Sequence, residues 1–270
     1  MPYTKEIEIF NIGRTSSDAS EIKRWLDSVG AVQYEVPEEA TPSDLVVGLA
    51  AKRCYMSFEV GLNPNVTRVR KDWFDYIENI LKSGHGSVLE HSTYNYAIEG
   101  LTRVATSELN RHRAGCAISE GSMRYIRLDK IPYWVPVLFR PNQDDIPAEA
   151  SKKVASLKVF EDAFTHDEQC YKSLCDIWSI QDMKDFGQKK KLTSAFRRVV
   201  GMGVCTGGVW SFNLRALRHI IALRSTDHAE EEIAMIASLI AKDICEKEKA
   251  VFCDFSQDEL GFWSPANKKI

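Results

Sequence analysis

One stretch of the chain changes its apolar period part-way along, and this change restricts the fold more than any other feature. Residues 92–100, STYNYAIEG, alternate aromatic or apolar with polar side chains, which predicts a half-buried strand. Apolar residues from Leu101 to Leu109 then recur at helical spacing, and Arg111 and Arg113 follow them. The sequence therefore predicts a strand that runs straight into a helix, with cations where the helix stops.

The stretch 103–125 concentrates four arginines, a histidine, two glutamates and four small hydroxyl side chains. Arg111, His112 and Arg113 place two permanent cations beside a titratable ring, a grouping suited to charge-assisted hydrogen bonds with phosphate. Because a helix C-terminus is partly negative, it helps to hold such cations toward a ligand. We interpret the stretch as an anion-binding site. The alternative is a solvated, charged helix end followed by a polar loop.

The end of this stretch, SEGSMRY, supports the anion-binding interpretation. Gly121 allows the backbone to approach a ligand closely, Ser122 offers a hydroxyl group, and Arg124 adds a fork-shaped donor. These are the side chains that a phosphate site needs.

The overall charge argues against a dedicated nucleic-acid-binding protein. The formal net charge is −3 over 270 residues, whereas such domains usually carry a strong basic excess. With 44% hydrophobic and 27% charged residues, the chain can bury a full core in one large domain or two small ones. No apolar run reaches the roughly 18 to 20 residues needed to cross a bilayer, and the start MPYTKEIEIF lacks a signal-peptide pattern. We therefore expect a cytoplasmic protein.

The seven cysteines are an odd number, and none forms a C-x-x-C pair. A disulfide framework or a zinc site is therefore not expected. Cys116 lies within the basic stretch, where the arginines would stabilise a thiolate. A nucleophilic role is one interpretation of Cys116, and a small buried thiol is the other.

Periodicity and turn signals predict the remaining elements. The first part of the chain predicts a strand at 7–10, a helix at 20–29, an extended piece at 32–36, a helix that begins after Thr41 and a helix at 71–82. The later part predicts a proline-rich loop at 126–147 with a short strand at 134–139, amphipathic helix at 148–190, turns at 188–191 and 206–208, and helices at 210–224 and 231–252.

The predicted helix at 210–224 carries polar groups in two directions. At 100° per residue, Asn213 and Arg224 fall about 20° apart, whereas Arg215 and His219 share a different side. A surface helix would show one polar stripe. We therefore expect this helix at a subunit junction between two ligand sites.

Residues 84–91, GHGSVLEH, predict a loop whose backbone can approach a flat ligand. Glycines flank His85, and Glu90 and His91 can fix the geometry of the loop. The order H-x4-E-H also resembles a metal motif, but its spacing is not that of a helical zinc-binding pair and no third ligand follows. We expect no metal site here.

Three motifs together resemble those of the flavin-dependent thymidylate synthases. R-H-R, a short spacer and S-E-G-S-M-R-Y resemble the family signature, and G-H-G-S-V-L-E-H resembles its G-H-x-[ST]-x-x-E-H segment. W-S-F-N-L-R-A-L, followed by L-R and D-H-A-E-E-E-I, resembles its C-terminal pattern. The likeness covers most of the chain. It implies an α+β fold, with a mixed, largely antiparallel sheet packed with helices, in which residues 1–270 form one domain.

The resemblance also implies an activity. The expected reaction is the reductive methylation of dUMP to dTMP, with methylenetetrahydrofolate as carbon donor, FAD as hydride carrier and NADPH as reductant. The implied assembly is a homotetramer with sites between subunits. Neither nucleic acid nor a membrane is expected as a partner.

The same resemblance assigns roles to individual residues. Arg224 would be catalytic, because it would face the pyrimidine and stabilise negative charge on its N3 and O2 side. The expected substrate-binding residues are Glu108, Arg111, Glu120, Gly121, Ser122, Met123, Arg124, Arg197 and Arg224. The expected flavin-binding residues are His85, Ser87, Arg111, His112, Arg113, Glu120, Asn213, Arg215 and His219.

The chain departs from the family pattern in four places. The spacer between Arg113 and Ser122 is one residue longer, Glu108 and Glu230 replace glutamines, and His219 replaces an asparagine.

Glu108 matters most among these departures, because a carboxylate would repel a phosphate unless Arg111 or Arg103 neutralised it. Two alternatives therefore stay open. One is a flavin- and folate-dependent methyl- or hydroxymethyltransferase that acts on another pyrimidine nucleotide. The other is a non-catalytic nucleotide-binding homologue.

Overall fold

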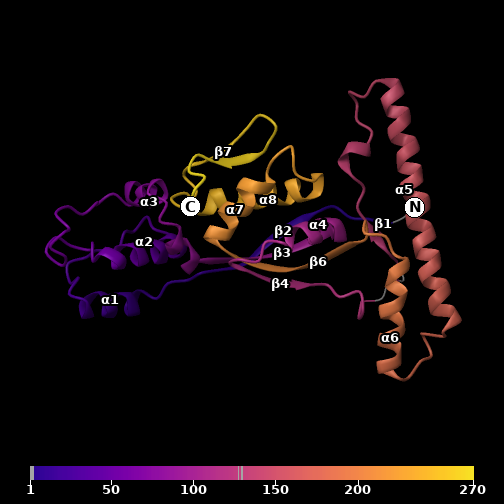
Figure 1. The fold of residues 1–270 in the computed structure, drawn as a ribbon, viewed down its shortest axis with the longest axis horizontal. Coiled ribbons are helices and arrows are strands. Elements are labelled where there is room, and N and C mark those ends of the chain that lie inside the picture. The colour runs from indigo at the N-terminus through magenta and orange to yellow at the C-terminus, as the bar shows by residue number, and fades with distance from the viewer. Residues whose placement is uncertain (1–2, 127, 129) are drawn as a thin grey trace.

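The computed structural model describes residues 3–126, 128 and 130–270, and a four-stranded antiparallel sheet runs through its middle (Figure 1). In spatial order the strands are β2 (Glu8–Arg14), β3 (Thr93–Thr102), β6 (Cys205–Asn213) and β4 (Cys116–Glu120). The two central strands pair along their length, with Tyr96 opposite Trp210, and both of these rings are fully buried. The sheet therefore supplies the middle of the core.

Three helices cover one face of the sheet (Figure 1). They are α4 (Arg103–Leu109), α7 (Leu214–Arg224) and α8 (Glu231–Lys247). α4 continues β3, and α7 continues β6, with no residue between strand and helix. Each helix begins at once because the last strand residue caps it: Thr102 Oγ1 accepts from the N–H of Val104 at 3.1 Å, and Asn213 Oδ1 accepts from the N–H of Ala216 at 2.8 Å.

The other elements lie toward the two ends of the sheet (Figure 1). At one end are α1 (Ala19–Ser28), α2 (Pro42–Tyr55), α3 (Trp73–Lys82) and the short helix η1 (Gly86–His91). At the other end are α5 (Pro147–Ile177), α6 (Phe186–Phe196), the short helices η2 (Val137–Phe139) and η3 (Arg197–Val199), and the parallel pair β1 (Tyr3–Thr4) and β5 (Pro132–Tyr133). A hairpin, β7 (Phe255–Gln257) and β8 (Trp263–Pro265), follows α8.

No helix of the described residues is long and apolar enough to pass through a membrane.

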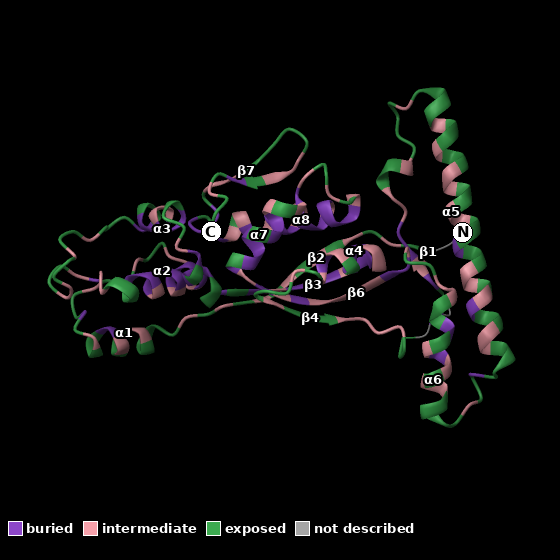
Figure 2. Cartoon of the chain, viewed as in Figure 1, coloured by how far each residue is buried: buried purple, intermediate pink, exposed green. Residues whose placement is uncertain are grey.

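Two clusters of apolar side chains hold these elements together. The larger one joins α2, α3, the sheet, α7 and α8. The smaller one gathers around Tyr133 and Phe164, whose rings stack with centroids 3.8 Å apart. α5 buries only Phe164 and Tyr171 among its described residues, so most of this long helix is exposed or half-buried (Figure 2).

The central predictions are confirmed. The strand expected at 92–100 is β3, and the helix expected after it is α4, with Arg111 just beyond its end. The α+β class and the largely antiparallel sheet are also confirmed. Thr41 caps α2 as predicted, because its Oγ1 accepts from the N–H of Asp44 at 3.1 Å.

The prediction of a helix at 210–224 is wrong at its start. Residues 210–213 continue β6, and 206–208 belong to the same strand rather than to a turn. Trp210 and Phe212 alternate with more accessible residues and are buried in the sheet, a strand pattern that the following helical period obscured. Asn213 is consequently the cap of α7, so its angular comparison with Arg224 does not hold.

Four smaller predictions are also wrong. The helix expected at 148–190 is interrupted between the end of α5 at Ile177 and the start of α6 at Phe186. Residues 32–36 form no strand, and the strand expected at 134–139 is replaced by β5 at 132–133 and by η2. Pro136 has no N–H to donate to a ladder, which accounts for the second change. Residues 188–191 lie inside α6 instead of a turn, because Asp185 caps that helix by accepting from the N–H of Gln188 at 3.1 Å.

A buried ion pair ties the C-terminal hairpin to α7. The Arg218 guanidinium donates to both carboxylate oxygens of Asp254, at 2.8 and 2.9 Å, and to the carbonyl of Val251 at 2.6 Å. Asp254 also accepts from the backbone and side chain of Asn267, each at 2.9 Å. Because both charges are buried and paired with each other, removing either partner would leave an uncompensated charge.

A second buried polar group links α2 to the end of α8. Asp44 and Glu248 are both buried, and Thr41 and Tyr94 donate hydroxyl groups to the Glu248 carboxyl group. Burial and the nearby charge of Glu248 raise the pKa of Asp44 from 3.8 to about 7. The folded protein therefore keeps a proton on Asp44 that the unfolded chain has already lost.

This difference predicts that Asp44 makes the protein less stable as pH rises. Its contribution to the free energy of unfolding is fully present below about pH 4 and is lost as pH rises toward 7. The Asp44→Asn variant cannot lose a proton, so its melting temperature is expected to fall less between pH 4 and 7 than that of the wild type. Thermal unfolding at several pH values tests this. The exposed Asp144→Asn variant is the matched control, and a wild-type slope in Asp44→Asn would contradict the prediction.

Candidate nucleotide and flavin site

The C-terminal end of α4 meets the C-terminal end of α7 through a carboxylate. Glu108 accepts from Arg224 at 3.0 Å and from Arg111 at 3.2 Å. Arg224 also donates from its Nε to Nε2 of His112 at 3.2 Å. Two motifs separated by about a hundred residues are thus joined in one cluster, and the carboxylate charge of Glu108 is neutralised by two guanidinium groups.

His112 is the neutral partner in this cluster. Burial lowers the pKa of His112, and the positive charge of Arg224 lowers it further. A neutral ring is required for Nε2 to accept from Arg224. The ring of His219 lies 5.8 Å from that of His112, edge to face, so His219 of α7 joins the same cluster.

Glu120, at the end of β4, belongs to an adjoining network. It accepts from Arg103, and from the side-chain amide of Asn110 at 3.1 Å. Asn110 in turn accepts from the Trp210 indole N–H at 3.0 Å. Sequence reasoning considered Arg103 only as a partner for Glu108 and missed the other two residues. Asn110 directly precedes the R-H-R motif, and this position could have identified it as a site residue from the sequence.

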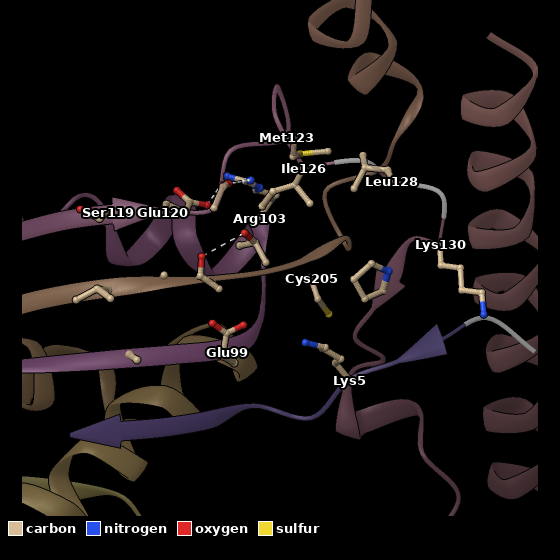
Figure 3. Close-up of a pocket in the computed structure, with 17 residues that line it drawn as sticks. Lys5, Glu99, Arg103, Ser119, Glu120, Met123, Ile126, Leu128, Lys130 and Cys205 are labelled. Atoms are coloured by element: carbon tan, nitrogen blue, oxygen red, sulfur yellow. Dashed lines mark hydrogen bonds and ion pairs between the residues drawn. The ribbon is translucent and has the colours of Figure 1, made fainter. Parts of the chain in front are cut away.

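A cavity of about 780 Å³ opens beside Glu120, between the sheet and residues 121–126, 128 and 130–132 (Figure 3). Arg103, Lys5 and Lys130 line it together with Glu99, so both charges are present. Its volume is in the range of small-molecule sites.

Gly121 lies at the edge of this cavity, where the chain crosses closely over β6. A Cβ at this position would lie 2.9 Å from Thr206 Oγ1 and 3.1 Å from the carbonyl of Gly207. The N–H of Gly121 donates to that same carbonyl at 2.8 Å. The glycine expected to allow a close approach therefore does so, toward β6.

Ser122, Met123 and Arg124 continue along the cavity toward α6. Met123 lines the cavity, and the carbonyl of Arg124 accepts from Thr193 of α6 at 3.3 Å. Arg197 follows α6 directly. Contact with α6 therefore brings the segment that carries Ser122 and Arg124 to the helix that leads into Arg197.

Three of the predicted arginines have free guanidinium groups. The side chains of Arg113, Arg124 and Arg197 are exposed and make no ion pair or hydrogen bond with any described residue. Arginines without a protein partner can take an anion without breaking an existing pair.

The flavin-binding residues predicted in the 84–91 segment lie in a separate group. Arg215, in the first turn of α7, pairs with Glu90 at 2.6 Å. Ser87 is exposed and His85 half-buried, and the ring of Tyr55 lies 5.9 Å from that of His85. The chain closes tightly on this segment, since a Cβ at Gly86 would lie 2.6 Å from the backbone carbon of Ile270.

Asn213 caps a helix, a role that differs from those of the Arg224 cluster and of the 84–91 segment. Its side-chain oxygen is engaged as the cap of α7, and its N–H donates to the carbonyl of Gly115 at 2.9 Å. It lies against the loop that follows R-H-R, and its side-chain oxygen already accepts from the N–H of Ala216.

Among the described residues, no hydrogen bond, ion pair or ring contact connects the Arg224 cluster, the free arginines near α6 and the 84–91 segment. The sequence predicted that these residues share one site. A single chain brings together Glu108, Arg111, His112, His219 and Arg224, and leaves the rest in neighbouring groups.

Cys116 is not an activated nucleophile. Burial raises the pKa of its thiol to about 11, so the thiolate is scarce at neutral pH. The interpretation as a small, partly buried thiol is therefore the better one.

Comparison with known proteins places this geometry in a family. A family model described as "Thymidylate synthase complementing protein" matches residues 37–248, most of the chain. The chain belongs to this family. The matched range includes every predicted site residue.

Relatives within the thymidylate synthase complementing protein family are similar along most of their length. The flavin-dependent thymidylate synthase of Corynebacterium diphtheriae is 31% identical over 229 residues, which cover 85% of each chain. That of Corynebacterium aurimucosum is 29% identical over 226 residues, covering 83% of this chain and 84% of the relative.

Solved structures share the fold of this family member. The UMP/dUMP methylase PolB of Streptomyces cacaoi, bound with 5-Br UMP, superposes with a TM-score of 0.63 at 18% identity and covers 93% of each chain. Thymidylate Synthase X of Helicobacter pylori, solved with FAD and dUMP, gives a TM-score of 0.54 at 21% identity, covering 92% of this chain and 97% of that one. The predicted fold is confirmed.

The contact between Arg224 and His112 predicts a change that can be measured without activity. In the Arg224→Gln variant the nearby positive charge is lost, so the pKa of His112 is expected to rise, while burial still holds it down. An NMR titration of the imidazole protons gives this pKa. Arg111→Gln is the control, because Arg111 binds the same Glu108 but is not among the charges that lower the pKa of His112. An unchanged pKa in Arg224→Gln would contradict the contact.

Proposed function

We propose that this protein is a flavin-dependent thymidylate synthase, which methylates dUMP to dTMP with methylenetetrahydrofolate, FAD and NADPH. The observation that carries the proposal is the cluster at the end of α4. There Glu108 and His112, from the R-H-R region, hold Arg224 from the C-terminal motif in place. Membership of the family supports the same activity.

Arg224 is the proposed catalytic residue. Its guanidinium group would donate to the N3 and O2 side of the pyrimidine, where negative charge develops as the ring is attacked. Glu108 and His112 hold that group by two contacts of 3.0 and 3.2 Å, so little reorganisation is needed when the substrate binds. Because His112 is neutral, it orients Arg224 without repelling it.

The phosphate of the nucleotide is assigned to the free arginines. Arg124 and Arg197, with the hydroxyl group of Ser122, would hold it, since these guanidinium groups have no partner among the described residues. Gly121 and Met123 shape the cavity wall beside them. A clamped phosphate fixes the base relative to the redox ring, and this orientation lowers the barrier.

The flavin is assigned to the segment around His85 and to the start of α7. His85 and Ser87 would contact the ring, and Arg113 and Arg215 the anionic part of the cofactor, with Arg111, His112, Glu120, Asn213 and His219 nearby. The residues fit such a group, because Arg113 is exposed and pairs with no described residue, and Ser87 is exposed beside the half-buried His85. When bound, FAD supplies hydride transfer.

The assembly is proposed to be a homotetramer with sites between subunits. One chain leaves its three groups of site residues unconnected, and a second chain would complete them. α5 exposes Val154, Val159 and Ile177, at 58, 69 and 74% of their surface, which fits a helix that is covered by another subunit.

We also expect residues 1–270 to act as one domain, in the cytoplasm.

Glu108 favours a second candidate substrate. A carboxylate only accepts hydrogen bonds, whereas the glutamine of the family pattern also donates. A nucleotide that offers a further donor, such as the ribose 2′-OH of UMP, would suit Glu108. Product analysis with dUMP, UMP and dCMP separates methylation of dUMP from methylation of another nucleotide.

The proposal predicts a yellow protein. Its absorption spectrum should show oxidised flavin, bleach anaerobically with NADPH, and recover when methylenetetrahydrofolate and dUMP are added together. dTMP should form in the same reaction. Arg224→Ala should keep the flavin spectrum and lose at least about a hundredfold in turnover, as when one preorganised donor is removed. A colourless protein that binds nucleotide would instead support the non-catalytic alternative.

The shared site predicts complementation between inactive subunits. Arg197→Ala and Arg224→Ala should each be inactive alone. If Arg197 of one subunit and Arg224 of another meet at one site, a mixed oligomer contains some sites with both arginines intact. Activity should then return partly after the two variants are mixed and reassembled. Each variant reassembled with itself is the control. Absence of recovery, with mixed oligomers shown by mass spectrometry, would place both arginines in one chain.

A further inference from the structure

A small cavity lies beside His85, and the charged side chains in its described lining are all basic. It has a volume of about 290 Å³ and lies between the end of α2, α3 and residues 68–70. Lys52, Arg68 and Arg70 line it, and His85 borders it from the 84–91 segment. No carboxylate belongs to its described lining. The described side chains of its lining therefore carry a net positive charge.

Lys52 is the most constrained of these cations. It is only 2% exposed and has no ion pair with any described residue. Its Nζ donates to the carbonyl of Ser57 at a long 3.5 Å, and lies 4.2 Å from the centre of the Tyr76 ring and 5.3 Å from that of Tyr34. Burial lowers the pKa of Lys52 to about 8. Aromatic faces compensate for only part of the cost of a buried ammonium group, and an anion would compensate for more.

The neighbouring cations are also available. Arg68 is exposed and makes no ion pair with a described residue, and Arg70 shares one with Asp75 at 3.2 Å at the surface. A second cavity of about 670 Å³ shares Lys52 and Arg70 with this one and adds Lys71, but Glu35, Glu59 and Asp72 are also in its wall. Those carboxylates would repel an anion. The smaller cavity is consequently the one suited to an anionic group.

We infer that this cavity binds the anionic end of a co-substrate whose ring reaches the flavin beside His85. This inference rests on the proposed function and adds to it the place where a co-substrate is held. The ring of Tyr55, also in the cavity wall, lies 5.9 Å from that of His85, so the cavity and the proposed flavin segment are contiguous. The volume accommodates one phosphate or carboxylate group with a short linker, and is at the lower limit for a whole ligand.

Two co-substrates carry such a group. NADPH has a phosphate on its adenosine ribose that NADH lacks, and methylenetetrahydrofolate ends in glutamate carboxylates. Both groups accept charge-assisted hydrogen bonds from lysine and arginine, so the chemistry of the cavity is the same for either. The two are separated by measuring each ligand on the same variants.

The experiment uses FAD-loaded protein with Arg68→Ala, Arg68→Lys and Lys52→Met. Dissociation constants for NADPH and NADH come from anaerobic flavin reduction at increasing nucleotide concentration, and that for methylenetetrahydrofolate from calorimetry. Arg68→Ala and Lys52→Met should each weaken one ligand by about 10-fold or more, the effect of losing a charged hydrogen bond. Arg68→Lys should recover part of that loss. Arg24→Ala, a solvent-exposed change in α1 outside the cavity, is the control and should leave all three constants unchanged.

Each outcome of this experiment either identifies the anionic group that binds or overturns the inference. Weaker NADPH with unchanged NADH identifies the phosphate, and weaker folate identifies the carboxylates. Unchanged constants for all three ligands in Arg68→Ala would overturn the inference, and because Arg68 is exposed this holds even where Lys52→Met fails to fold. The proposed function fails separately, when wild-type protein forms no methylated nucleotide although Arg68→Ala still weakens a ligand.

Discussion

The buried carboxyl group of Glu232 fixes the point at which β3 becomes α4. Thr102 donates its backbone N–H and its hydroxyl group to the two oxygens of Glu232, which is 1% exposed. Burial raises the pKa of Glu232 to about 7, and the hydrogen bonds from Thr102 oppose that rise. α8 thereby determines where α4 starts. A shift of one residue in α4 would rotate the R-H-R motif by roughly 100°, so the geometry of Glu108, His112 and Arg224 depends on this contact.

The charges of the site divide into those with a protein partner and those without. Glu108 and Glu120 each take guanidinium groups from another element, which builds a rigid frame. Arg113, Arg124 and Arg197 have no such partner among the described residues. A chain with a net charge of −3 can therefore hold several phosphates, because its acids neutralise the frame and leave other arginines for ligands.

The sequence was informative where the pattern was local. Alternation at 92–100 and the helical period after Leu101 identified β3 and α4, because both are set by neighbouring residues. The start of α7 was misplaced since the apolar run from Trp210 suits a strand and a helix alike, and only pairing with β3 decides between them. β5 forms by pairing with β1, which lies far earlier in the chain, and Tyr133 also bridges to Val204, so no local pattern could predict this strand.

The same contrast between local patterns and long-range contacts applies to the site residues. The R-H-R motif, Arg224 and the 84–91 segment were identified by resemblance, and their roles stay predictions. The sequence named Arg111 and Arg103 as the groups that could neutralise Glu108, and the structure pairs Glu108 with Arg111 and gives Arg103 to Glu120. The second partner of Glu108, Arg224, and the link from Asn110 to Trp210 join residues about a hundred positions apart, which spacing cannot show. The cationic cavity around Lys52 was not foreseen either, because Arg68 and Arg70 line it from a separate segment, which the pattern around Lys52 and Arg53 cannot show.

The ion pair between Arg218 and Asp254 has a dynamic consequence. Arg218 lies six residues before Arg224 on α7. The hairpin that it holds returns to the end of that helix, where the backbone N–H of Trp263 donates to the hydroxyl group of Ser225 at 2.8 Å. The helix and the last residues of the chain are thus expected to open and close as one cooperative unit, with similar hydrogen-exchange protection. Loosening at the hairpin, far along the sequence from the R-H-R motif, would transmit directly to the guanidinium group of Arg224, for which we propose the catalytic role.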